Sequence, residues 1–181
     1  MKISNPIKES SFAIYGLGLS GNSTLRFLKK NNNKKIYTWD DKKNKNNKKK
    51  FNLFQKILDD VDYIIVSPGI NIQKTKFKKK LFSNKKKIIT DLDIFYMQKI
   101  PIKSIVITGT NGKSTACKLI QHILKTNKLD AQLGGNIGKP VLDLRIRKKS
   151  VVIIEASSFQ LAHTKFIKPT FAAILNISID H

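Results

Sequence analysis

The stretch SIVITGTNGKSTACKLI, residues 104–120, places a β-branched run, two glycines and a lysine directly before an apolar-patterned segment. This order is typical of a strand that leads through a phosphate-binding loop into a helix. The commoner form of that loop is G-x-x-x-x-G-K-[ST], and the place of its first glycine is held here by Ile107. The glycines of this chain, Gly109 and Gly112, lie closer together, but the G-K-S half is intact. The sequence therefore favours a nucleotide site over a chance run of turn residues.

The residues of this turn suit the binding of nucleotide phosphates. Glycine at 109 and 112 frees the backbone to wrap phosphate oxygens, and the helix that follows offers N–H groups to an anion. Lys113 brings a mobile positive charge, and the Ser114 hydroxyl is a ligand that Mg²⁺ accepts. We therefore interpret the turn as a phosphate site with an associated magnesium ion.

Short β-branched runs alternate with helical patterns along the chain, which predicts an α/β fold with parallel sheets of the doubly wound type. The expected strands are 11–15, 36–39, 62–66, 87–90, 104–108, 151–155 and 171–177, and the expected helices are 22–30, 51–58, 91–99 and 113–126. Pro101 lies in the joint QKIPIK, where we place the boundary between two domains, residues 1–98 and 99–181.

Two local expectations follow from the residue patterns. Apolar residues recur three and four positions apart in the expected helix 113–126, which predicts one buried face. Its members are Ala116, Leu119, Ile120, Ile123 and Leu124. The Lys/Asn tract at 42–50 is expected to be a surface loop.

A second glycine motif, GLGLSG, follows the first expected strand. It supplies Gly16, Gly18 and Gly21, a full G-x-G-x-x-G between a strand and a helix. Such a turn binds a pyrophosphate at the helix N-terminus, and Asp40 lies where a ribose-binding acid is expected. Taken alone, the motif indicates a dinucleotide such as NAD or a nucleotide sugar, with a purely structural glycine turn as the alternative.

Further polar residues stand at the carboxyl ends of the expected strands, where ligands bind in such sheets. Glu155 ends an apolar strand, and because an isolated carboxylate is costly to bury, a cation partner is expected; simple exposure at the strand tip is the alternative. Ser157 and Ser158 suit the capping of a helix at least as well as binding. We expect packing or surface roles for Cys117, His122 and His163.

The bulk composition narrows the possible partners. The net charge of +23 raises the possibility of nucleic-acid binding, but most of it is lysine mixed with asparagine, in tracts without aromatic residues for base stacking. We therefore expect no specific nucleic-acid partner. The chain has one cysteine, no apolar run long enough to span a membrane and no leader-like start, so we expect a cytoplasmic protein without a membrane association.

The motifs together resemble the Mur ligases, the ATP-dependent amide-forming enzymes of peptidoglycan precursor synthesis. The matching words are GLGLSG, SPGI, ITGTNGKST, GGNIGKP, EASSFQL and LNISIDH, and they run from Gly16 to His181. In this family the phosphate loop has the form G-[TS]-N-G-K-[ST], so Ile107 belongs to the strand. The loop alone is shared with folylpolyglutamate synthases, whereas GGNIG and SSFQL point to the members that add D-glutamate. Two positions depart from the usual pattern: Asp41, where threonine is common, and Ala162, where an acidic residue often stands.

The resemblance implies a Rossmann-like domain that binds the UDP substrate, followed by the first part of a P-loop-type central domain that binds ATP. It implies that ATP phosphorylates the carboxylate of UDP-N-acetylmuramoyl-L-alanine and that the amine of D-glutamate attacks the acyl phosphate. ATP would be bound by Gly109, Thr110, Asn111, Gly112, Lys113, Ser114 and Thr115. The UDP substrate would be contacted by Leu19, Ser20, Asp40, Ser67, Asn136 and His181. Mg²⁺ would be held by Ser114, Glu155 and His181, and the catalytic residues would be Lys113, Glu155 and His181.

The resemblance also implies that much of the ATP and D-glutamate site lies beyond His181, so we expect a monomeric N-terminal fragment that is inactive alone. The alternatives are another Mur-type or folylpolyglutamate-type ligase, and a nucleotide-binding module without chemistry.

Overall fold

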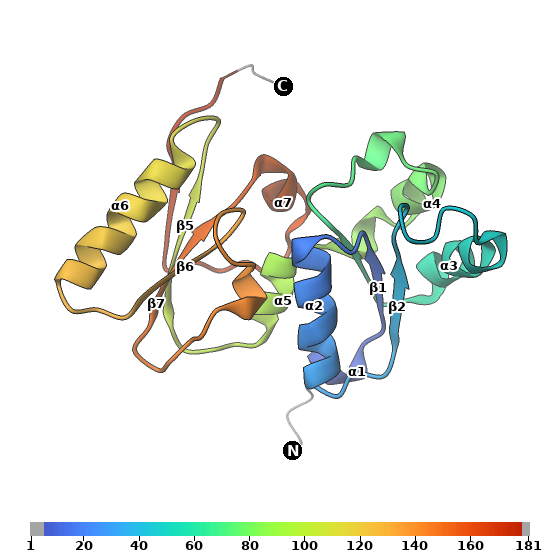
Figure 1. Cartoon of the computed structure of the whole chain (residues 1–181), viewed down its shortest axis with the longest axis horizontal. Helices are drawn as coiled ribbons and strands as arrows, with labels where there is room; N and C mark the ends of the chain where they lie inside the picture. Colours follow the sequence, from blue (N-terminus) through green and yellow to red (C-terminus); the bar gives the residue numbers. More distant parts are fainter. Residues whose placement is uncertain (1–5, 179–181) are drawn as a thin grey trace.

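The computed structural model describes residues 6–178 and contains two four-stranded parallel sheets that lie side by side (Figure 1). The strand order is β2-β1-β3-β4 in the first sheet and β6-β7-β5-β8 in the second. The strands are β1 (Phe12–Tyr15), β2 (Ile36–Trp39), β3 (Tyr63–Val66), β4 (Ile88–Ile89), β5 (Lys103–Thr108), β6 (Ala131–Gly135), β7 (Val151–Glu155) and β8 (Phe171–Ile174). The predicted α/β class with parallel sheets is confirmed.

Helices and short 3₁₀ turns connect the strands. The α-helices are α1 (Pro6–Glu9), α2 (Leu19–Lys30), α3 (Lys48–Asp60), α4 (Lys78–Ser83), α5 (Asp91–Met97), α6 (Lys113–Thr126) and α7 (Ser158–His163). The 3₁₀ turns are η1 (Ile72–Lys74), η2 (Lys85–Lys87) and η3 (Val141–Asp143). The strand β6, rich in glycine and without a β-branched residue, is one that the sequence pattern did not predict.

The first sheet is buried on both faces because the side chains of β1 alternate between two apolar clusters. Ala13 and Tyr15 pack with Phe54 of α3 on one face, whereas Phe12 and Ile14 pack with Leu28 of α2 on the other. Helices on both faces of a parallel sheet are the reason that its strands read as continuous apolar runs.

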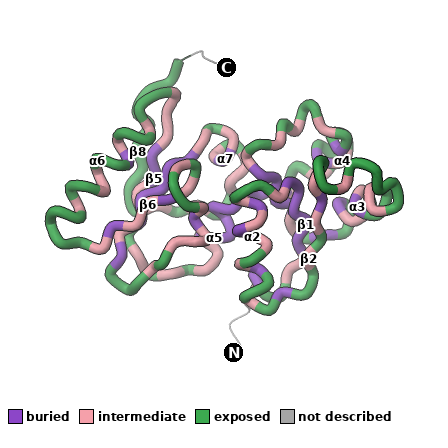
Figure 2. Tube along the Cα trace, viewed as in Figure 1, coloured by how far each residue is buried: buried purple, intermediate pink, exposed green. Residues whose placement is uncertain are grey.

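The second sheet has α6 on one face and α5 on the other, and α5 also packs against the first sheet. Leu92 and Phe95 of α5 belong to the cluster that contains Val106 of β5, whereas Ile94 belongs to the cluster under β1. Figure 2 shows the resulting buried core running along both sheets and through α5. The division of the chain at residue 98 remains a prediction, since α5 serves both sheets.

The expected apolar face of α6 is only partly buried. Cys117 and Ile120 pack against the sheet, but Leu119 and Ile123 are 57% and 50% exposed. The apolar arc of this helix is wider than the strip that the sheet covers, so its outer members face solvent.

The Lys/Asn tract 42–50 is also not a loop throughout, because α3 begins at Lys48. The Asn47 side chain accepts a hydrogen bond from Lys50 N at 2.8 Å and so caps this helix.

The outer strand of the second sheet, β8, is exposed along its whole length, with Phe171 61% and Ile174 66% exposed. Parallel strands are ordinarily covered on both faces.

Within residues 6–178, no helix combines the length and the apolar character that a membrane crossing requires.

Candidate functional site

A cavity of about 380 Å³ lies at the carboxyl end of the first sheet, next to the loop between β6 and η3 of the second. It is lined by every predicted substrate-contact residue that lies within the described part of the chain: Leu19, Ser20, Asp40, Ser67 and Asn136. The sixth, His181, lies outside the described residues. The parallel arrangement explains this convergence, because it brings the carboxyl ends of the strands to one edge.

The GLGLSG turn is held in contact with the loop after β3. Gly16 has a φ of +91°, and its carbonyl oxygen accepts a hydrogen bond of 2.7 Å from the Ser67 hydroxyl. A Cβ atom on Gly21 would lie 1.9 Å from that same carbonyl oxygen, so only glycine allows α2 to approach this closely. The Ser67 hydroxyl therefore connects the glycine turn to the loop after β3 at the wall of the cavity.

Asp40 fixes the backbone around the cavity. Its carboxylate accepts hydrogen bonds from Leu17 N at 2.8 Å, Lys42 N at 3.0 Å and Lys43 N at 3.1 Å. Partial burial raises the pKa of Asp40, but these backbone bonds outweigh it, and the net pKa lies below its ordinary value. The side chain is thus a carboxylate at neutral pH, and carboxylates can also accept a ribose hydroxyl.

Asp41, which departs from the family pattern, is bonded to aromatic side chains of the first sheet. Tyr15 Oη donates to one carboxylate oxygen at 2.6 Å, and Trp39 Nε1 donates to the other at 2.8 Å. Burial and then the bond to Asp41 raise the pKa of Tyr15. Asp41 therefore satisfies the polar ends of two buried aromatic residues.

A second cavity of about 670 Å³ opens over the phosphate loop at the carboxyl end of β5. Gly112 has a φ of +80° and directly precedes α6, and Gly109 has a φ of +147°. Lys113 Nζ donates to the carbonyl oxygens of Gly109 at 2.6 Å and Thr110 at 2.7 Å. The ammonium group is thereby held over the loop. Thr115 lies in the exposed first turn of α6.

Ser114, in the first turn of α6, and Glu155, the last residue of β7, meet beside this loop. The Ser114 hydroxyl donates to Glu155 Oε2 at 2.7 Å, and Asn136 Nδ2 lies 3.4 Å from Oε1. Glu155 is only 3% exposed, so the alternative of a carboxylate simply exposed at the strand tip is wrong. A hydroxyl and a carboxylate beside phosphate-binding groups form an oxygen set that fits Mg²⁺, which usually takes few protein ligands together with phosphates. Among residues 6–178 no cluster of three His, Cys, Asp or Glu side chains could hold a metal, and His181 lies beyond them.

The phosphate loop is held by a residue that the sequence patterns left without a role, Asn176. Its side chain accepts from Asn111 N at 2.9 Å and donates to Asn111 O at 3.1 Å, while its backbone oxygen accepts from Thr110 N. Asn176 follows β8, which pairs with β5. A polar residue just beyond an apolar strand, in the motif LNISIDH, was the available sign.

The α7 segment links the two sheets through buried polar groups. Ser157 and Gln160 form a capping box, which confirms the capping interpretation of Ser157, and Gln160 Nε2 donates to Asp91 Oδ1 at 3.0 Å. Asp91 is 3% exposed, and burial raises its pKa. Asp93 Oδ1 accepts from Lys165 N at 2.6 Å.

Cys117 behaves as a packing residue. It is fully buried against the second sheet, and burial followed by the charge of Glu155 raises the pKa of its thiol to about 11. A thiol of that pKa carries almost no thiolate at neutral pH, so it is no nucleophile.

Known proteins resemble this chain over most of its length. It matches the N-terminal domain of the MurD-like Mur ligases over residues 10–89 and the Mur ligase middle domain over residues 107–181. It is 36% identical to the UDP-N-acetylmuramoylalanine–D-glutamate ligase of Wolbachia pipientis, with 98% of the chain and 36% of the relative covered. It is 37% identical to the enzyme of that name from Rickettsia prowazekii, and the match covers 98% of this chain and 41% of the relative. It is 40% identical to the enzyme of that name from Buchnera aphidicola, and the match covers 93% of this chain and 40% of the relative. The chain thus spans about two fifths of the length of these relatives.

Proposed function

Since this chain belongs to the Mur ligase family, we propose that it supplies the sugar-nucleotide cleft and the phosphate loop of an ATP-dependent amide ligase. The reaction is the addition of D-glutamate to UDP-N-acetylmuramoyl-L-alanine, a step in peptidoglycan precursor synthesis. The choice of substrates is supported by the names of the relatives, all of which are D-glutamate ligases.

The observation that carries this proposal is the position of Asn136. It lines both the cavity beside the glycine turn and the cavity over the phosphate loop, and it also contacts Glu155. A substrate with a uridine diphosphate at one end and a carboxylate at the other needs two such sites in contact with each other. A module that binds only a dinucleotide needs the first cavity and has no use for a second phosphate loop.

The groups around the phosphate loop suit phosphoryl transfer to a carboxylate. That reaction brings several negative charges together, so catalysis consists mainly of positioning and neutralisation. Lys113 would leave its two carbonyl partners to contact the transferred phosphoryl group. Ser114 and Glu155 would hold Mg²⁺, which when bound supplies charge neutralisation at the phosphates. Asn136 Nδ2 would orient the muramoyl-alanine end of the substrate.

The proposal also covers the partners, the location and the oligomeric state of the chain. The lysine-rich surface raises the concentration of anionic substrates near the clefts through its long-range field, without any need for a nucleic-acid partner. The chain has a single, buried cysteine and so can form no internal disulfide, which supports a cytoplasmic location. We further propose that the chain is monomeric.

Ligand binding by the 181-residue chain tests this function. Calorimetric titration with UDP-N-acetylmuramoyl-L-alanine is expected to give saturable binding, which Asn136→Ala weakens about tenfold because a polar contact is lost. Binding of ATP is expected to strengthen when Mg²⁺ is added, and Glu155→Gln is expected to remove that gain.

The matched control is Asp60→Asn, which likewise replaces one carboxylate by an amide, at an exposed position at the end of α3 on the first sheet. It is expected to leave the Mg²⁺ dependence unchanged. Tight binding of NAD instead of the UDP compound would refute the ligase and favour a dinucleotide module.

A further inference from the structure

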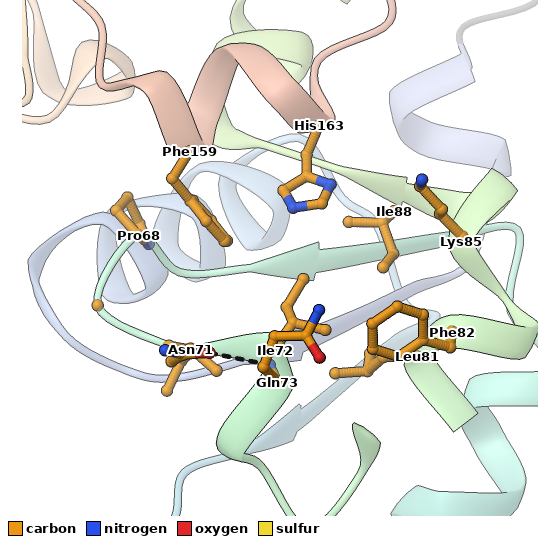
Figure 3. A pocket seen from close by; sticks show the side chains of 12 residues that line it. Pro68, Asn71, Ile72, Gln73, Leu81, Phe82, Lys85, Ile88, Phe159 and His163 are labelled. Atoms are coloured by element: carbon orange, nitrogen blue, oxygen red, sulfur yellow. Dashed lines mark hydrogen bonds between the residues drawn. The ribbon is translucent and has the colours of Figure 1, made fainter. Parts of the chain in front are cut away.

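A third cavity, of about 470 Å³, lies outside both clefts, between α7 and the loop that follows β3. Its volume is in the range of small-molecule sites. In Figure 3, Phe159 and His163 point from α7 across the opening toward the segment that carries Ile72 and Gln73, and Lys85 stands at the side. None of the predicted ligand-binding residues within 6–178 lines this cavity.

The walls of the cavity are mainly apolar. Ile70 and Ile72 come from the loop and η1, Phe82 from α4, and Phe159 from α7. Phe159 is half-buried, and Phe82 is 45% exposed although it is aromatic. The rings offer a surface on which a flat apolar group can pack.

The charge at the rim is positive and comes from Lys85. Lys85 and His163 are the titratable residues among those that line the cavity, and no carboxylate of the part of the chain that the structure describes does so. Lys165 lies close enough to act on the same imidazole: burial first, then the charges of Lys85 and Lys165, lower the pKa of His163. Two acids lie on neighbouring elements: Asp93 accepts hydrogen bonds from the backbone of Lys165 and Phe166, and Asp59 pairs with Lys80 and accepts a hydrogen bond from Asn84; neither lines the cavity. Lys85 therefore has no carboxylate beside it among the described residues that line the cavity.

We propose that this cavity is a binding site for a small molecule that joins an aromatic or apolar body to a single anionic group. The body packs between Phe159 and Ile72, and the anion faces Lys85 and His163. Because Ile70 and its two preceding residues line both this cavity and the substrate cleft, the ligand touches the back of the cleft wall.

The test uses 1-naphthoate as probe, added to the 181-residue chain and followed by nuclear magnetic resonance of the histidine rings. The chain has three histidines, and loss of one signal in His163→Gln assigns the relevant ring. Naphthoate is expected to shift this signal in a saturable way and to raise the pKa of His163, since an anion favours the charged imidazole. Neutral 1-naphthalenemethanol is expected to bind at least about tenfold more weakly.

Variants distinguish specific binding in this cavity from non-specific binding of anions to a basic chain. Lys85→Met and Phe159→Ala are each expected to weaken naphthoate binding about tenfold. Lys118→Met removes an equally exposed lysine from α6, and Leu19→Ala removes an apolar side chain from the substrate cleft; both are expected to leave the affinity unchanged. Lys85 is exposed, so its replacement does not threaten folding.

Equal binding of the neutral and anionic probes would overturn the proposal, because the positive rim would then play no part. It would be overturned as well if Lys118→Met weakened binding as much as Lys85→Met, or if Leu19→Ala abolished it.

Discussion

Replacement of Gly21 by alanine is the sharpest test of how the glycine turn is built. The added Cβ would lie 1.9 Å from the carbonyl oxygen of Gly16 and 2.7 Å from the Ser67 hydroxyl, and ordinary contacts begin near 3.4 Å. The nearest atom is backbone, which cannot rotate away as a flexible side chain does. Relief therefore requires α2 to move outward from β1 by about 1.5 Å, which would also disturb the packing of Leu28.

The expected loss of stability is the difference between two effects. Overpacking against backbone at this distance costs about 3–4 kcal/mol, at or above the upper end of the usual range. Alanine in place of glycine inside a helix returns about 1 kcal/mol, because the unfolded chain loses less entropy. We expect Gly21→Ala to lower the free energy of unfolding by about 2–3 kcal/mol.

Urea denaturation followed by tryptophan fluorescence measures this change. Trp39 is the only tryptophan, it is buried, and it lies in β2 of the same sheet. Gly18→Ala is the matched control, because no atom lies within 4 Å of the added Cβ, and its effect should stay below about 1 kcal/mol. If Gly21→Ala changes stability by no more than Gly18→Ala, the close approach of α2 to the turn is not what requires glycine.

Three further outcomes are expected. Burial raises the pKa of Asp91, so the folded chain keeps this proton where an unfolded aspartate has lost it, and stability falls as the pH rises. Asp91→Asn, which can still accept a hydrogen bond from Gln160, should therefore lose less stability than the original chain as the pH rises above about 4 in urea titrations; equal losses would contradict this reasoning. The buried thiol of Cys117, with its pKa of about 11, should react with a disulfide reagent only after unfolding, and rapid reaction of the native chain would contradict its burial. Removal of the α3 cap in Asn47→Ala should cost about 1 kcal/mol in urea denaturation followed by the fluorescence of Trp39, and unchanged stability would contradict the capping role.

Much of the fold could be predicted because its causes are local. The alternation of β-branched runs with helical patterns predicted seven of the eight strands, and the start of α6 at Lys113 follows from the glycine before it. The strand β6 could not be predicted, because its residues pair with β7 only through tertiary packing and have little strand preference of their own. Helices α2 and α3 begin three residues earlier than expected, at Leu19 and Lys48. For α2 the feature that sequence could not show is tertiary, the close contact of Gly21 with Gly16 and Ser67. For α3 the cause is local, because the Asn47 side chain bonds to Lys50 N three positions on.

The candidate site, like the fold, could be predicted from the sequence only in part. Glycine, lysine and serine next to one another predicted the phosphate loop from sequence, since backbone freedom and charge are properties of the residues themselves. Sequence could not show that Ser114 donates to Glu155, although both were predicted as magnesium ligands, nor that Asn176 holds the loop from 65 positions away. Those contacts exist because β5 lies between β7 and β8 in the sheet, which brings three strand ends together.

The sequence by itself therefore determined the types of element and the chemistry available at each strand end. Only the tertiary structure decided which of those ends meet, because the order of strands in a sheet is set by packing among distant segments and not by local preference. The same packing formed the apolar cavity between α7 and the loop after β3, whose residues carry no common motif in the chain.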